Sequence, residues 1–251
     1  MKDRPVIALS GVDFGYDSSP VLTDVNLTIS EREFVWVVGP NGGGKTTLLK
    51  LILGLVRPSR GTVRVLGQSP RRVRPRLGYM PQQIRLDQQF PADVSDIVLM
   101  GRLGNLPRWG AQRRRDREIV DRVLHEVDLW EQRHQVFSSL SGGQQRRLLI
   151  ARALVAEPEI LLLDEPTANL DLAVEQELFE LLRRLNQRLT IVMVSHDPAF
   201  VSQFVKRVVC VNRSVAVHPT SAMEEDIMAE LYGRQVRLVR HDRHNSHEEN
   251  R

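Results

Sequence analysis

Short apolar runs and longer amphipathic stretches alternate along this chain of 251 residues. A run such as residues 160–163 is too short for a helix and is typical of a strand buried on both faces. Apolar positions three and four residues apart, as between residues 174 and 189, indicate amphipathic helices. On this basis we predict strands at residues 6–9, 25–29, 34–38, 62–66, 77–80, 160–163, 190–194 and 208–211.

The order of these elements predicts an α/β fold. Buried strands that alternate with amphipathic helices form a parallel sheet covered by helices. The first 70 residues are rich in strand and turn patterns, which predicts a small antiparallel sheet beside this core. Residues 91–152 have no strand pattern and predict a helical insertion. Residues 241–251 are nearly all polar, so we expect a disordered tail there.

The composition is typical of a soluble globular protein, with 41% hydrophobic and 26% charged residues and a formal net charge of +4. No apolar run approaches the roughly 20 residues of a membrane-spanning helix, and residues 1–5 lack the apolar core of a secretory signal. The single cysteine, Cys210, excludes an internal disulfide framework. Any membrane role would therefore depend on a partner chain.

The strongest chemical motif is a glycine-rich loop. It reads Gly39-Pro40-Asn41-Gly42-Gly43-Gly44-Lys45-Thr46. This sequence fits the phosphate-loop pattern G-x-x-x-x-G-K-[ST] and lies between a predicted strand and a helical stretch at residues 47–55. Glycines let backbone N–H groups turn towards phosphate oxygens, and the helix N-terminus adds partial positive charge. Lys45 would reach the β- and γ-phosphates, and the Thr46 hydroxyl would bind Mg²⁺.

Two carboxylates, Asp164 and Glu165, directly follow the predicted strand at residues 160–163. The carboxyl ends of parallel strands face the ligand crevice. Asp164 would hold Mg²⁺, and Glu165, on the opposite side of the strand, would polarise an attacking water. The alternative is a pair of acidic caps, but the phosphate loop upstream favours the catalytic interpretation.

A second glycine pair opens a strongly helical stretch after Leu140. Ser141 and Gln144 form an S-x-x-Q capping box, so a plain helix start is one interpretation. However, Gly142 and Gly143 carry a helix penalty of about 1 kcal/mol each. Their missing side chains would let backbone N–H groups approach an anion, which favours a second helix N-terminus that faces phosphate.

Together these motifs resemble those of the ATP-binding subunit of ABC (ATP-binding cassette) transporters. The phosphate loop resembles Walker A, residues 140–144 match the signature motif, and Asp164 with Glu165 resembles Walker B and the catalytic glutamate. Tyr16 resembles the adenine-stacking aromatic, and Gln82 resembles the Q-loop glutamine. Residues 168–171 resemble the D-loop, and His196 resembles the switch histidine. The resemblance covers residues 4–217, approximately, in the family's order.

The resemblance implies a P-loop NTPase fold, with a RecA-like parallel core, an N-terminal antiparallel β subdomain and an inserted α-helical signature subdomain. It implies a nucleotide-binding domain at residues 4–240 that uses ATP and Mg²⁺. Catalysis would involve Glu165, His196, Lys45 and Gln82. The Mg²⁺ site would involve Thr46, Gln82 and Asp164. Nucleotide contacts would come from Tyr16, Gly39, Pro40, Asn41, Gly42, Gly43, Gly44, Lys45, Thr46, Thr47, Ser141, Gly142, Gly143, Gln144 and Asp171.

The family mechanism pairs two cassettes head to tail, so the signature of one subunit would close on the ATP of the other. Glu165 would then orient water, His196 would contact the γ-phosphate, and Gln82 would sense Mg²⁺. Alternatives remain for single residues. In the alternative interpretations, Tyr16 is an ordinary core residue and His196 is a strand-end cap. Gln83 would compete with Gln82 for the sensing role, since both follow Pro81.

Residues 90–102 follow the pattern F-P-x-x-V-x-D-x-V-x-M-G-R. This pattern is similar to that of importers of zinc, manganese or ferrous iron, in a region that touches the membrane subunit. Importers of ferric siderophores, haem or cobalamin share its D-x-V-x-x-G-R part. We therefore expect an ATPase at the cytoplasmic face of the membrane that energises an importer of divalent metal ions, zinc or manganese. It would work with a polytopic permease and an extracytoplasmic substrate-binding protein. The alternatives are an iron-chelate, haem or cobalamin importer and a soluble ABC protein.

We assign no metal-binding or nucleic-acid-binding role to two polar clusters. His241, His244 and His247 are spaced by three residues, but Asn245 and Ser246 disfavour a stable helix, so we expect solvated side chains rather than zinc ligands. The arginine-rich run at residues 113–117 predicts a solvated helix start or a contact with the membrane subunit or lipid headgroups. Nucleic-acid binding is not expected.

Overall fold

The computed structural model describes residues 5–17, 19–82, 92–105, 111–168, 170–195, 205 and 207–219. The described strands form two sheets, of three and six strands. Among the described residues, no helix is long and apolar enough to cross a membrane.

The three-stranded sheet is antiparallel, with the order β2-β1-β4. Its strands are β1 (Pro5–Tyr16), β2 (Ser19–Ser30) and β4 (Arg60–Val65). Ile7 of β1 pairs with Ile29 of β2 on one side and with Val65 of β4 on the other. This confirms the small antiparallel sheet, although β1 and β2 are each much longer than the apolar segments predicted for them.

The six-stranded sheet has the order β5-β6-β7-β3-β8-β9. Its neighbours pair in parallel as far as β8, and β9 pairs antiparallel with β8. The strands are β3 (Phe34–Val38), β5 (Leu77–Met80), β6 (Ile160–Asp164), β7 (Thr190–Val194), β8 (Arg207–Asn212) and β9 (Ser214–Pro219). The predicted parallel core is confirmed, whereas β9 was not predicted.

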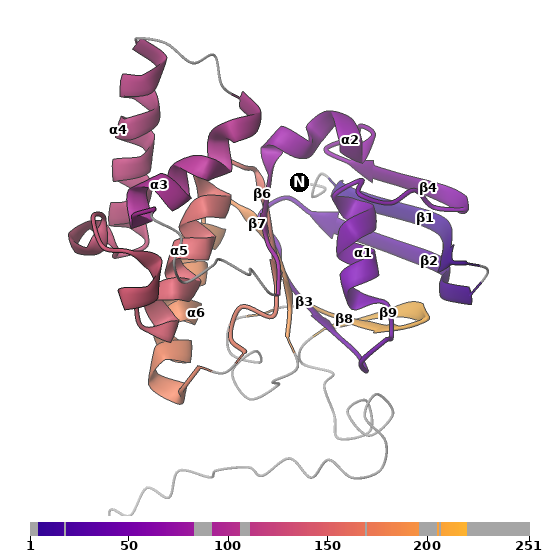
Figure 1. Ribbon diagram of the computed structural model, residues 1–251. Helices are drawn as coiled ribbons and strands as arrows, with labels where there is room; N and C mark the ends of the chain where they lie inside the picture. Colours follow the sequence, from indigo (N-terminus) through magenta and orange to yellow (C-terminus); the bar gives the residue numbers. More distant parts are fainter. Residues whose placement is uncertain are drawn as a thin grey trace, which may run out of the picture.

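Helices cover both faces of the six-stranded sheet, as Figure 1 shows. Alternate side chains of β3 divide between the two hydrophobic clusters: Trp36 packs on the face of α3 to α6, and Val37 packs on the face of α1 and the antiparallel sheet. The helices are α1 (Lys45–Ile52), α2 (Pro70–Val73), α3 (Val94–Leu99), α4 (Ala111–Glu126), α5 (Gly142–Leu154) and α6 (Leu172–Asn186), with 3₁₀ turns at Arg74–Arg76, Met100–Asn105, Trp130–Gln132 and Phe137–Ser139.

The helices α3, α4 and α5 lie between β5 and β6 in the sequence. In the described part of this segment the chain forms helices and turns, and its only pairing in a β pattern is the isolated bridge between Asp93 and Val136. The predicted helical insertion is therefore present. Its apolar side chains belong to the cluster that packs on β3, β6 and β7, so the insertion is fixed to the parallel core.

Candidate functional site

The phosphate loop connects the end of β3 to the start of α1. Gly44 is the N-cap of α1 and has φ of 107°, a conformation that favours glycine. A Cβ atom on Gly39 would lie 2.0 Å from the carbonyl oxygen of Val211, and one on Gly43 would lie 2.7 Å from the same oxygen. The loop therefore needs glycine both for its backbone angles and for its close approach to β8.

The turn between β8 and β9 supports this loop from outside. The N–H of Arg213 donates to the carbonyl of Gly43 at 3.1 Å, and the N–H of Thr23 donates to the carbonyl of Arg213 at 2.7 Å. Sequence reasoning missed this support. Arg213 lies in the turn itself, with φ of 59°. Only the tertiary structure places this turn against the phosphate loop.

Lys45 lies inside the loop. Its Nζ donates hydrogen bonds to the carbonyl oxygens of Gly39 at 2.8 Å and Pro40 at 2.9 Å, and the residue is 7% exposed. Burial lowers the pKa of Lys45, and the charges of Glu165 and Asp164 oppose this shift. The ammonium group is thus held where it can exchange carbonyl oxygens for phosphate oxygens.

Thr46 and Asp164 meet across the loop. The Thr46 hydroxyl donates to Oδ2 of Asp164 at 3.1 Å. Asp164 is 2% exposed, and burial raises its pKa, while the hydrogen bond from Thr46 lowers it. A hydroxyl and a buried carboxylate that converge in this way fit a hard cation such as Mg²⁺, which prefers oxygen ligands.

Glu165 lies directly after β6, with φ of 52°. Its N–H donates to the carbonyl of Val194 at the end of β7, at 2.9 Å. Oε2 of Glu165 accepts a hydrogen bond from Nε2 of Gln82 at 2.5 Å. The structure therefore brings together two predicted catalytic residues that lie on neighbouring strand ends.

Tyr16 lies at the end of β1 and is 43% exposed. Its ring packs edge-on against Phe14, with centroids 4.8 Å apart, and Nζ of Lys50 lies 5.9 Å from the Tyr16 ring centroid. Because Lys50 belongs to α1, the ring stands beside the helix that follows the phosphate loop. Thr47, in the first turn of α1, is buried.

The signature segment begins α5 as predicted. Ser141 is the N-cap: its Oγ accepts from the N–H of Gln144 at 3.3 Å, and its own N–H donates to Oε1 of Gln144 at 2.9 Å. A Cβ atom on Gly143 would lie 2.5 Å from Cγ1 of Val174 in α6. The sequence suggested that glycine at position 143 lets an anion approach the backbone. Packing against α6 of the same chain is a second reason why this position requires glycine.

The remaining predicted residues are placed in part. Oδ1 of Asp171 accepts from the N–H of Val174 at 3.0 Å and so caps α6. His196 lies outside the described residues, as do Asn169, Gln83, the histidines of the tail and residues 83–91. The residue before His196 is described: Ser195 is buried, and its carbonyl accepts from Nε1 of Trp36 at 3.2 Å.

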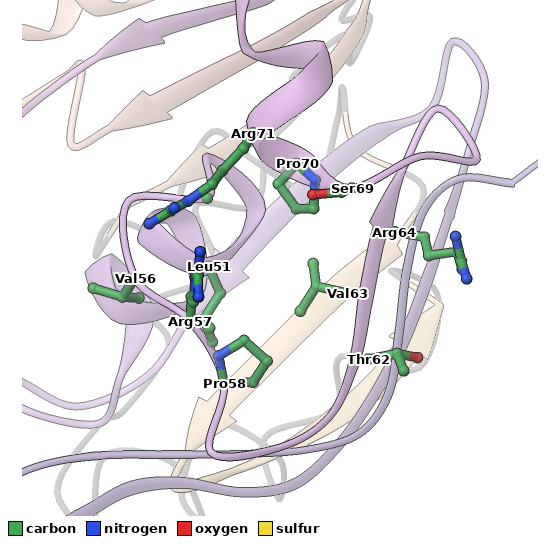
Figure 2. A pocket seen from close by; sticks show the side chains of 11 residues that line it. Leu51, Val56, Arg57, Pro58, Thr62, Val63, Arg64, Ser69, Pro70 and Arg71 are labelled. Carbon is green, nitrogen blue, oxygen red and sulfur yellow. The ribbon is translucent and has the colours of Figure 1, made fainter.

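A separate pocket of about 430 Å³ lies at the other end of α1 (Figure 2). Leu51 and Val63 form part of its apolar lining. Arg57 and Arg71 stand on one side of it and Arg64 on the other. Because the phosphate loop precedes α1 and Leu51 lies near the end of that helix, this pocket is distinct from the phosphate site.

Comparisons with known proteins agree with this geometry. Residues 22–168 match the protein family described as ABC transporter. ZnuC of Bacillus subtilis, the ATP-binding protein of a high-affinity zinc uptake system, is 36% identical over 211 residues, which is 83% of this chain and 91% of that protein. MntB of Halalkalibacterium halodurans, a manganese transport system ATP-binding protein, is 35% identical over 216 residues, 86% of each. A solved structure described as a metal-chelate type ABC transporter, inward-facing, has a TM-score of 0.81 at 30% identity and covers 91% of this chain and 88% of its own.

Proposed function

Because this chain belongs to the ABC transporter family, we propose that it is the ATP-hydrolysing subunit of an importer of divalent metal ions, zinc or manganese. The observation that carries the ATPase assignment is the convergence of Lys45, Thr46, Asp164, Glu165 and Gln82 around one phosphate loop. Binding groups alone would not require a carboxylate such as Glu165 beside the buried Asp164.

The proposed site contains residues that bind the nucleotide and Mg²⁺ and residues that act in hydrolysis. Backbone N–H groups of the loop and the Lys45 ammonium bind phosphate oxygens, and Thr46 and Asp164 hold Mg²⁺, which offsets charge on the phosphates. Glu165 orients the attacking water once Gln82 releases its carboxylate. His196 contacts the γ-phosphate, and the exposed face of Tyr16 stacks on the adenine. The nucleotide-binding domain spans residues 4–240, with its helical subdomain at about residues 91–152.

The signature residues support a head-to-tail homodimer. In the described structure Ser141, Gly142 and Gly143 lie beside Gln144, Leu170 and Val174, respectively, rather than beside the phosphate loop of the same chain. We infer that the N-terminus of α5 instead faces the nucleotide of a partner subunit, as in the family mechanism. Each ATP site is completed only when two chains pair.

Relatives named for zinc and manganese uptake support the proposed cargo. Their names, as ATP-binding proteins of uptake and transport systems, also support a permease partner in the membrane. We propose that the chain lies at the cytoplasmic face of that permease and that an extracytoplasmic binding protein delivers the metal. A second candidate is an importer of metal chelates, which is favoured by the likeness to the metal-chelate type transporter. Uptake of radioactive zinc, manganese and ferric siderophore by a deletion strain distinguishes the candidates. Unchanged uptake of all three would exclude both.

The variant Glu165→Gln tests the ATPase assignment. It keeps the shape of the side chain but removes the carboxylate, so hydrolysis should fall by about a hundredfold or more, while ATP should still bind and stabilise the dimer. Gel filtration with and without ATP, together with phosphate release, measures both effects. Lys45→Ala is the matched control because it should prevent dimerisation by weakening ATP binding. Native hydrolysis by Glu165→Gln would exclude the role of Glu165.

A further inference from the structure

The signature helix α5 packs on Ala168 and Leu170 of the D-loop of its own chain. A Cβ atom on Gly142 would lie 3.9 Å from Cδ2 of Leu170, and the contact of Gly143 with Val174 continues the same interface into α6. In the proposed dimer, the signature serves the partner's ATP, whereas Glu165 serves the ATP of its own chain. The contact between α5 and the D-loop therefore joins elements of two different ATP sites.

Arg146 is the polar link in this contact. Its Nη2 donates a hydrogen bond to the carbonyl of Ala168 at 3.0 Å. The N–H of Ala168 donates in turn to the carbonyl of Glu165 at 3.4 Å, so Ala168 and Glu165 belong to one turn. Burial lowers the pKa of Arg146, and the charge of Glu165 raises it, which is consistent with a half-buried guanidinium near that carboxylate.

The neighbouring arginine makes different contacts. Arg147 donates to Asp128 at 2.8 Å and to Glu177 at 2.8 Å, and so ties α5 to the end of α4 and to α6. Of the two adjacent arginines, only Arg146 has a described hydrogen bond to the turn that carries Glu165. A shift of the signature helix would therefore move that turn through position 146.

We propose that Arg146 is a positioning residue that couples the two ATP sites, by transmitting the position of the signature helix to the turn that carries Glu165. This inference rests on the proposed dimer. When the signature of one chain closes on the partner's ATP, Arg146 pulls the Ala168 carbonyl with it and aligns Glu165 in its own site. Hydrolysis at one site then depends on occupancy of the other.

The test compares three substitutions in the full chain: Arg146→Met removes charge and donors, Arg146→Lys keeps the charge and one donor group, and Arg146→Gln keeps a donor without charge. For Arg146→Met we expect kcat to fall about tenfold and the Hill coefficient for ATP to fall from about 2 towards 1. The dissociation constant of ATP should stay within about twofold, because Arg146 has no described contact with the phosphate loop. Lys and Gln should restore part of the cooperativity.

The control is Arg183→Gln, which removes an exposed arginine that pairs with Glu180 on α6. It should leave the Hill coefficient and kcat unchanged. A cooperative Arg146→Met variant would overturn the coupling, and so would equal losses in all three variants with a lower melting temperature. An active wild-type protein without cooperativity would overturn the coupling alone. An inactive wild-type protein would overturn the proposed function and the coupling with it.

Discussion

Nε2 of Gln82 donates a hydrogen bond to Oε2 of Glu165 at 2.5 Å, which joins the segment after β5 to the segment after β6. This bond occupies one acceptor position of the carboxylate that, in the proposed mechanism, orients the attacking water. In the proposed mechanism, Gln82 would therefore influence the availability of the Glu165 carboxylate, without a described contact between Gln82 and the phosphate loop.

The first prediction concerns this bond. Gln82→Ala should lower kcat by about tenfold and leave the KM for ATP within about twofold, because the amide positions Glu165 and does not bind ATP directly. Steady-state hydrolysis over a range of ATP concentrations measures both constants. Gln68→Ala, at an exposed glutamine in the turn after β4, is the control. A raised KM with native kcat would instead assign Gln82 to nucleotide binding.

The second prediction concerns the two signature glycines. Gly143→Ala should lower the melting temperature, because a Cβ atom there would lie 2.5 Å from Cγ1 of Val174, and overpacking costs about 1–3 kcal/mol. Gly142→Ala should fold with native stability, since its nearest contact would be 3.9 Å away. The double variant Gly143→Ala/Val174→Ala should recover stability. No recovery in thermal melts would refute the packing explanation for Gly143.

The third prediction concerns the charge of Asp164. Burial raises its folded-state pKa above the ordinary value. The contribution of Asp164 to the free energy of unfolding therefore favours the folded state below the ordinary pKa. This contribution is lost as pH rises through the folded-state pKa. Asp164→Asn, which stays neutral, should make the nucleotide-free protein at least as stable as the native one near neutral pH. The difference should vanish below about pH 4, and ATP hydrolysis should be lost.

Urea denaturation at several pH values checks this prediction for Asp164→Asn, with Glu131→Gln as a control at an exposed carboxylate. A variant that is destabilised equally at every pH would show that the carboxylate is needed for packing and that its buried charge does not disfavour folding.

The fourth prediction concerns a buried ion pair within the helical insertion. Nε of Arg102 donates to Oδ1 of Asp116 at 2.7 Å, and the two side chains are 9% and 5% exposed. Arg102→Met should cost about 3–5 kcal/mol, because it removes the guanidinium that pairs with a buried carboxylate. Arg102→Met/Asp116→Leu should recover most of this loss. Chemical denaturation measures it, and Arg183→Met, from an exposed pair, should change stability by less than about 1 kcal/mol.

The Arg102 pair also explains part of the sequence pattern at residues 90–102. Nη1 of Arg102 donates to the carbonyl of Val155, and a Cβ atom on Gly101 would lie 2.1 Å from the carbonyl oxygen of Arg152. The Gly-Arg end of the pattern thus fixes the 3₁₀ turn Met100–Asn105 to the end of α5. These two positions are explained by packing, so they carry no direct information about the transported substrate.

The sequence by itself determined the elements whose cause is local. The strands β3, β5 and β7 have the predicted bounds, because a continuous apolar run must be buried on both faces. The Ser141 cap of α5 was predicted because its capping box lies within four residues. By contrast, β1 extends to Tyr16 because its pairing with β2 continues as far as Tyr16 and Ser19, and the apolar segment of β1 alone did not show this end.

Only the tertiary structure decided which distant residues meet. The bonds from Gln82 to Glu165, from Arg146 to Ala168 and from Arg213 to Gly43 each join segments that are apart in the sequence. A hydrophobic pattern states that a segment is buried, but not which segment lies beside it. Strand order and helix packing supply that partner, and they place the polar side chains at the strand ends within hydrogen-bonding distance.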